Sequence, residues 1–123
     1  MNHLSQFSNQ PFLSLETRRK DGTAVPTPVW FVQDGDTLFV RTLDGSGKVK
    51  RARNFPEVRV MPCDAQGGSL GTWQDGTSSV DGAEAYGRIK DLLITKYGPD
   101  VQQFEERTHA AGGKYTVITI VLA

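Results

Sequence analysis

Residues 37–53 read TLFVRTLDGSGKVKRAR, and the rest of the sequence can be organised around this stretch. Its first part, Thr37–Leu43, is rich in β-branched and aromatic residues and predicts a strand. Asp44-Gly45-Ser46-Gly47 then predicts a turn. The cation-rich segment that follows, 46–55, predicts a short helix that begins at a serine and ends before a proline. A strand, a turn and a basic helix therefore follow one another directly.

Basic side chains gather in this stretch. Five cations stand against one acid, a local net charge of +4; they are Arg41, Lys48, Lys50, Arg51 and Arg53, with Asp44 as the acid. The whole chain has 14 basic and 14 acidic residues, so the remainder carries −4. A concentrated cation cluster attracts anions by Coulomb forces and by charge-assisted hydrogen bonds. A basic turn at the end of a strand suits the phosphate tail of a cofactor; the alternative is a solvated helix face.

Length and composition exclude several classes of protein. A chain of 123 residues predicts one domain, 1–123. An overall charge of zero argues against a nucleic-acid or membrane partner. Cys63 is the single cysteine and there are two histidines, so we expect neither a disulfide nor a metal site. The chain has no apolar signal region and no long apolar run, which predicts a cytoplasmic protein.

The hydrophobic pattern predicts more strands than helices. Alternating or β-branched runs predict strands at 11–17, 25–33, 37–43, 58–63, 69–80 and 114–122, with Gly71 and Gly76 as candidate bulges. We expect the first three of these to form an antiparallel meander, because Asp-Gly turns connect them. Helical spacing begins at 81 and ends at Gly98-Pro99, and 100–110 predicts a shorter helix. The fold class is therefore mostly β (α+β), a six-stranded antiparallel barrel with one or two helices.

An ordered series of short segments resembles a known family. The segments are Leu13-Ser14-Leu15-Glu16-Thr17-Arg18-Arg19, Pro26-Thr27-Pro28-Val29-Trp30-Phe31, Leu38-Phe39-Val40-Arg41-Thr42, Ser46-Gly47-Lys48-Val49-Lys50-Arg51 and Val58-Arg59-Val60. Together they resemble the pyridoxamine 5′-phosphate oxidase-like split β-barrels, which bind flavins and deazaflavins (the FMN-binding split-barrel type). Within that family the series is most similar to small members that use coenzyme F-420, and the similarity spans nearly the whole chain.

This resemblance implies a homodimer with cofactor sites at the subunit interface, and hydride transfer between the cofactor ring and a small organic substrate. It implies that Lys48 and Arg51 hold the cofactor phosphate beside the turn of Ser46 and Gly47. It further implies that Arg41 and Thr42 end the preceding strand at the site. The backbone of a fourth segment would line the ring: Thr27, Pro28, Val29 and Trp30. The resemblance identifies no catalytic residue.

Several alternatives stay open at this stage. Coenzyme F-420 and FMN both offer a phosphate and a tricyclic ring, so an FMN-dependent oxidoreductase is the main alternative. A cofactor-binding protein without turnover is a second, and a barrel that binds single-stranded nucleic acid is a third. Trp30 and Phe31 are adjacent and face opposite sides of a strand, so one is core and the other lines an interface or the cofactor.

Overall fold

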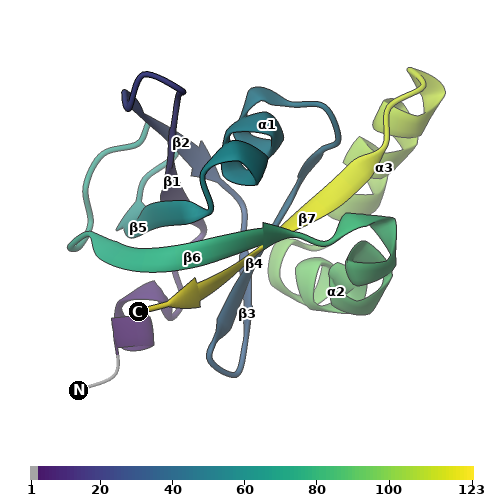
Figure 1. Ribbon diagram of the computed structural model, residues 1–123. Coiled ribbons are helices and arrows are strands. Elements are labelled where there is room, and N and C mark those ends of the chain that lie inside the picture. The colour runs from purple at the N-terminus through teal and green to yellow at the C-terminus, as the bar shows by residue number, and fades with distance from the viewer. Residues whose placement is uncertain (1–2) are drawn as a thin grey trace.

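Seven antiparallel strands form one curled sheet with the order β2-β1-β5-β6-β7-β4-β3 in the computed structural model, which describes residues 3–123 (Figure 1). The strands are β1 (Phe12–Arg18), β2 (Ala24–Val29), β3 (Val32–Asp34), β4 (Thr37–Leu43), β5 (Glu57–Cys63), β6 (Gln74–Val80) and β7 (Tyr115–Leu122). The mostly β, antiparallel split-barrel fold class is confirmed, although the strand count is seven rather than six.

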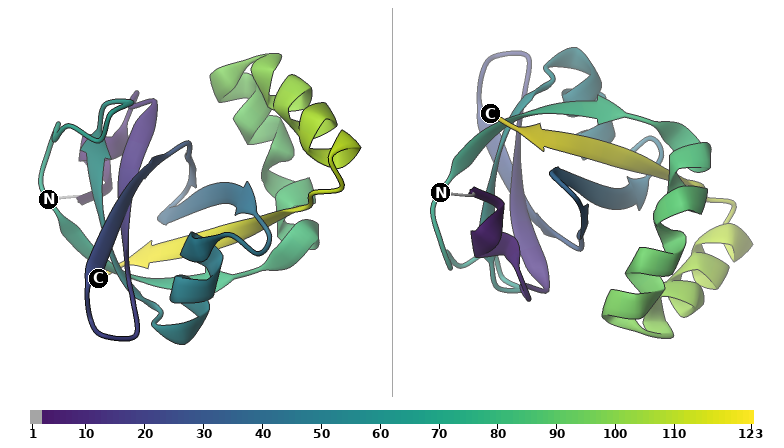
Figure 2. Two further views of the ribbon diagram at one scale, coloured as in Figure 1. Left: turned by 90° about the horizontal axis from the view of Figure 1, so that it is seen from above. Right: turned by 90° about the horizontal axis from the view of Figure 1, so that it is seen from below.

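The helices lie outside the sheet. A short 3-10 helix, His3–Phe7, precedes β1, and α1 (Gly47–Asn54) follows β4 as the cation-rich segment predicts, with Ser46 at its N-cap. The two longer helices, α2 (Gly82–Tyr97) and α3 (Asp100–Ala110), lie side by side at the end of the sheet away from β1 and β5 (Figure 2).

The expected strand at 25–33 is broken at Trp30 and Phe31, and this break accounts for the extra strand. The first piece, β2, pairs with β1, whereas the second, β3, pairs with β4 at the opposite edge of the sheet. Both pairings of the expected meander are present, β1 with β2 and β3 with β4, but the three strands are not continuous neighbours, because β2 and β3 lie at opposite edges of the sheet. At the break, the backbone of Phe31 makes hydrogen bonds with side chains rather than with a neighbouring strand. Its N–H donates to Tyr97 Oη, and its carbonyl accepts from Lys96 Nζ.

β6 also differs from its prediction. It begins at Gln74, and the preceding residues of the expected strand form a loop. Gly76 is not a bulge, because it pairs in regular register with Val58 on β5 and Leu122 on β7. A Cβ at Gly76 would lie 3.1 Å from the carbonyl oxygen of Val121, closer than an ordinary contact, so glycine favours the close approach of β7 here.

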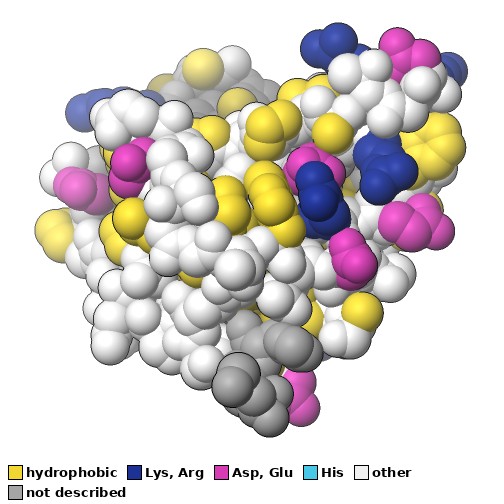
Figure 3. Space-filling model, turned by 90° about the vertical axis from the view of Figure 1, so that its left-hand side faces the viewer, with side chains coloured by type: hydrophobic (Ala, Val, Ile, Leu, Met, Phe, Trp, Pro, Cys, Tyr) yellow, Lys and Arg dark blue, Asp and Glu magenta, His cyan; other side chains and the backbone are white. Residues whose placement is uncertain are grey.

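Buried side chains form two clusters that meet at the sheet. The first fills the curl of the sheet and includes Leu15, Phe31, Leu38 and Ile118. The second lies between the sheet and the helical end, where Leu93 of α2 is completely buried. The outer surface is mixed: on the face seen from the left of Figure 1, hydrophobic side chains form patches between Lys, Arg, Asp and Glu side chains (Figure 3).

Candidate functional site

A hollow of about 350 Å³ opens where β2 and β4 end, between α1 and α3. Val29, Trp30, Arg41, Thr42 and Lys48, all expected at the site from the sequence, line this hollow. The remaining lining residues are Leu43, Phe104, Arg107, Thr108 and Tyr115. We refer to this cavity as the α1–α3 hollow. Aromatic rings and cations thus share one small cavity.

Lys48 carries a positive charge into the hollow from the first turn of α1. Half-burial lowers the pKa of its ammonium group, and the nearby positive charge of Arg51 lowers this pKa further. Within residues 3–123, neither cation forms an ion pair. The first turn of α1 contains no acid, and the Ser46 side chain makes no capping hydrogen bond. Instead Ser46 Oγ lies 3.4 Å from Thr42 Oγ1. The first amide groups of the helix and two cations are therefore available to an anion.

Gly47 explains how Arg51 reaches the start of α1. A Cβ at Gly47 would lie 2.7 Å from a terminal nitrogen of the Arg51 guanidinium, so the missing side chain makes room for that group. The guanidinium is fixed on its other side, where Arg51 Nε donates a hydrogen bond of 2.7 Å to Thr17 Oγ1. Arg51 does not line the hollow itself. Its guanidinium instead places a positive charge beside Gly47, at the start of α1 and outside the hollow.

Arg41 is more constrained than the sequence suggests. Its guanidinium carbon lies 4.3 Å from the ring centroid of Tyr115, and its Nη1 donates to Tyr86 Oη at 3.2 Å and to the Val101 carbonyl at 3.3 Å. Tyr86 Oη in turn donates to Glu105, which pairs with Lys90 at 3.0 Å. This network ties β4 to α2 and α3. Arg41 lines the hollow, and the two hydrogen bonds of its Nη1 restrain its guanidinium within the protein.

Trp30 forms a wall of the hollow. Its indole stacks on the Tyr97 ring with centroids 4.2 Å apart and planes 6° apart, and Phe104 packs edge-on at 5.5 Å. Trp30 is half-buried, whereas its neighbour Phe31 is 1% exposed and contacts Phe7 in the core. Of the two aromatic residues, Phe31 is therefore core and Trp30 faces the site.

Two expected site residues, Thr27 and Pro28, lie in β2 before Val29 and outside the hollow. Thr27 pairs with Leu15 and Pro28 pairs with Ser14, and neither lines the hollow. Conversely, the sequence prediction missed Leu43, next to the expected Thr42, and four residues from distant elements: Phe104, Arg107 and Thr108 of α3 and Tyr115 of β7. No local signal marks these four, because only the packing of the helical end against the sheet brings them to the hollow.

The described part of the chain adds two observations. Residues 3–123 contain no group of three or more His, Cys, Asp or Glu side chains that could hold a metal ion. In the same range, none of the helices combines the length and the apolar character that crossing a membrane requires.

Comparison with known proteins identifies the fold. No protein-family model matches the chain, and no curated protein matches its sequence. Among solved structures, a pyridoxamine 5′-phosphate oxidase-like protein from Listeria innocua is 21% identical with a TM-score of 0.68, covering 97% of this chain and 89% of that one. HutZ, the heme storage protein from Vibrio cholerae, gives 12% identity and a TM-score of 0.73, covering 97% and 86%. An F-420 reductase gives 16% identity and a TM-score of 0.66, covering 100% and 94%. The chain therefore has the fold of the pyridoxamine 5′-phosphate oxidase-like split barrels.

Proposed function

We propose that this protein is an oxidoreductase that binds coenzyme F-420 in the α1–α3 hollow and transfers a hydride to an unsaturated or oxidised small organic molecule. One observation carries the proposal: aromatic side chains meet in one cavity with three cations, Arg41, Lys48 and Arg107, that form no ion pair within residues 3–123. The likeness in fold to an F-420 reductase supports it as well.

The phosphate end of the cofactor fits the start of α1. Lys48 and Arg51 are close enough for one charge to lower the pKa of the other, so a bound phosphate would relieve their repulsion. The amide groups in the first turn of α1 add the positive end of the helix dipole. Arg107 of α3, which also lines the hollow, adds a third cation on the opposite side.

The ring end of the cofactor fits the aromatic wall. A flat ring is accommodated by offset or edge-on contacts with aromatic side chains, and Trp30, Phe104 and Tyr115 offer such surfaces. Since a cavity of about 350 Å³ is small for a tricyclic cofactor with its tail, we propose that a second copy of the chain completes the site. The protein would then act as a homodimer with the cofactor at the interface.

The cofactor would supply the hydride chemistry. The chain's own residues would bind the phosphate through Lys48, orient the ring against Trp30 and exclude water with Phe104 and Leu43. Arg41 would act as a fixed positive charge near the ring, because Tyr86 and Val101 restrain its guanidinium.

The proposal is tested by titrating the protein with coenzyme F-420 and, in parallel, with FMN, while following protein and cofactor fluorescence. Lys48→Ala should weaken deazaflavin binding by about 1.5–3 kcal/mol, roughly 10- to 150-fold, as expected for a hydrogen bond to a charged group. Lys50→Ala is the matched control, since Lys50 lies on the same helix but is exposed outside the hollow. An unchanged dissociation constant in Lys48→Ala would reject its assigned role.

The other outcomes separate the alternatives. Tighter binding of FMN would make the protein an FMN-dependent oxidoreductase of the same fold. Tight binding of coenzyme F-420 without oxidation of the reduced cofactor by any substrate tested would favour a carrier without turnover. Sedimentation at micromolar concentration should show a dimer, and a monomer that binds cofactor at full affinity would contradict the shared site. If neither cofactor binds, oligonucleotide binding through the basic turn is the remaining candidate.

A further inference from the structure

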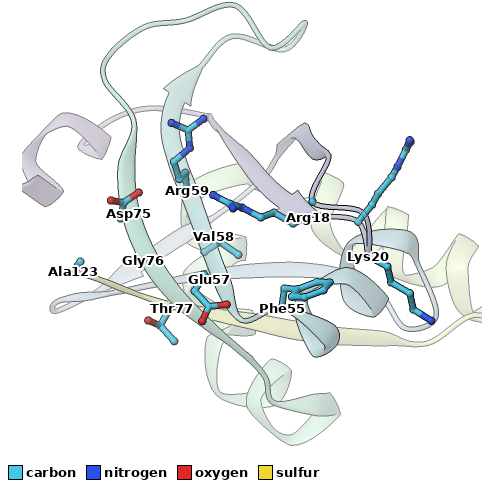
Figure 4. Close-up of a pocket in the computed structure, with 12 residues that line it drawn as sticks. Arg18, Lys20, Phe55, Glu57, Val58, Arg59, Asp75, Gly76, Thr77 and Ala123 are labelled. Atoms are coloured by element: carbon cyan, nitrogen blue, oxygen red, sulfur yellow. The ribbon is translucent and has the colours of Figure 1, made fainter.

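A second and larger cavity has a volume of about 580 Å³. It lies between the turn of the β1–β2 hairpin, the start of β5 and the start of β6. It shares no lining residue with the α1–α3 hollow. Figure 4 shows Arg18 extending into it toward Arg59, whereas Lys20 points away from the cavity. We refer to this cavity as the hairpin pocket.

Arg18 brings a positive charge that the protein does not neutralise. It is the last residue of β1, its side chain is exposed, and within residues 3–123 that side chain makes no hydrogen bond and no ion pair. Its guanidinium nevertheless extends over the pocket rather than away from it (Figure 4). A guanidinium in this position presents a fork of N–H donors to whatever occupies the cavity.

Arg59 faces the same pocket and is held rigidly. Its Nε and Nη2 each donate to Glu16 at 2.8 Å, and its guanidinium carbon lies 4.8 Å from the centroid of the Trp73 ring. Glu16 is 5% exposed, so this bidentate pair is held at the edge of the core. Nη1 of Arg59 makes no hydrogen bond in the part of the chain that the structure describes, so this nitrogen is free to donate to a ligand.

The other walls restrict what could bind. The Phe55 ring and the Val58 side chain both line the cavity, and together they give it an apolar wall (Figure 4). Glu57 and Asp75 are acidic and line the pocket as well, and the charge of Asp75 acts on Arg59. These acids repel an anion from their own positions, so a negative group is favoured beside Arg18 and Arg59, the arginines that line the pocket next to β5.

We propose that the hairpin pocket binds a small organic oxyanion, a phosphate or a carboxylate, which Arg18 and Arg59 hold while an apolar body lies on Phe55. Planar oxyanions match the guanidinium fork, and an aromatic or other flat body matches the apolar wall. This site is separate from the proposed cofactor site and does not depend on it.

The two tryptophans make the test selective, because Trp73 contacts Arg59 at the hairpin pocket and Trp30 lines the other cavity. In Trp30→Phe, Trp73 is the sole tryptophan, and its fluorescence is followed while phenyl phosphate or benzoate is added at constant ionic strength. We expect a saturable change with at least one probe; which probe saturates identifies the oxyanion. Adding Arg18→Ala should weaken binding at least tenfold, whereas Arg88→Ala, an exposed arginine on α2 outside the pocket, should leave it unchanged.

Three results would overturn the inference: no saturable change with either probe, an equal dissociation constant in Arg18→Ala, or equal binding of neutral benzyl alcohol. A further variant distinguishes the two cavities. If the probes bind at α1 instead, Lys48→Ala rather than Arg18→Ala will weaken them. Failure of coenzyme F-420 binding would leave this outcome unaffected, since the hairpin pocket shares no residue with that site.

Discussion

Replacing Tyr97 with Phe removes one oxygen atom that organises the break between β2 and β3. The Tyr97 hydroxyl accepts the Phe31 N–H at 2.9 Å, and it lies 2.7 Å from the Pro11 carbonyl oxygen and 3.0 Å from that of Phe31. A phenol has one proton, so it donates to one of these two carbonyls at a time. The hydroxyl therefore makes one donated and one accepted hydrogen bond where no strand satisfies the backbone.

The size of the effect follows from these two bonds. Losing the donated bond costs about 1 kcal/mol, and the Phe31 carbonyl keeps its other donor, Lys96 Nζ at 2.8 Å. The Phe31 N–H is left without an acceptor, which costs a further 1–3 kcal/mol or so for a buried donor. The ring of Phe retains the stack on Trp30. We therefore expect Tyr97→Phe to lower the free energy of unfolding by about 2–4 kcal/mol.

Urea denaturation measures this loss as a lower midpoint at an unchanged m-value. Tyr115→Phe is the matched control: its hydroxyl contacts Thr108 Oγ1 and the Phe104 carbonyl, so its removal strands no backbone N–H, and the loss should stay within about 1 kcal/mol. If Tyr97→Phe costs no more than Tyr115→Phe, then water or a small backbone shift satisfies Phe31, and the inference that Tyr97 holds the break is wrong.

Two further predictions concern stability. Burial lowers the pKa of Lys96 from 10.5 to about 8. Between these two pH values the folded state binds fewer protons than the unfolded state, so stability increases with pH. The urea midpoint should therefore rise from pH 8 to pH 10, and Lys96→Met should abolish this rise. The range stops at pH 10 because burial raises the pKa of Tyr97 to about 12, which makes stability fall with pH above that point. Gly76→Ala should lower the free energy of unfolding by about 1–3 kcal/mol, since its Cβ would press on the backbone of Val121. Gly87→Ala in α2, where nothing lies within 4 Å, should instead stabilise by up to about 1 kcal/mol, and urea denaturation measures both changes.

Local sequence signals predicted most of the elements well. The β-branched run at the C-terminal end is β7, the segment 100–110 is α3, and the serine and proline around the basic segment bound α1. These signals succeed because capping, turn chemistry and side-chain alternation act over a few residues. The family resemblance, rather than a local signal, implied that Arg41, Lys48 and Trp30 belong to one site. These three residues do line one cavity, and the cofactor in it is a proposal.

Strand pairing was not predictable in the same way. Asp-Gly turns correctly indicated that β1 and β2 form a hairpin, but no local feature indicates that β1 also pairs with β5. The contribution of α3 to the hollow has the same origin. Phe104 and Arg107 lie on an amphipathic helix, and the packing of α3 on α2, and of α2 on β7, decides where α3 lies. Long-range contacts of this kind leave no periodic trace in the sequence.

The break at Trp30 and Phe31 links stability to the proposed function. If 25–33 were one continuous strand, Trp30 and Phe31 would alternate across a single sheet and β3 would not reach β4. Instead the chain crosses from one edge of the sheet to the other, Phe31 enters the core, and Trp30 is left facing the hollow. Tyr97, at the end of α2, fixes the positions of both Phe31 and Trp30. Its hydroxyl bonds the Phe31 backbone, and its ring stacks on the Trp30 indole. The C-terminal turn of α2 therefore sets the position of the aromatic wall, and a change there should alter ligand binding in the hollow without touching a residue that lines it.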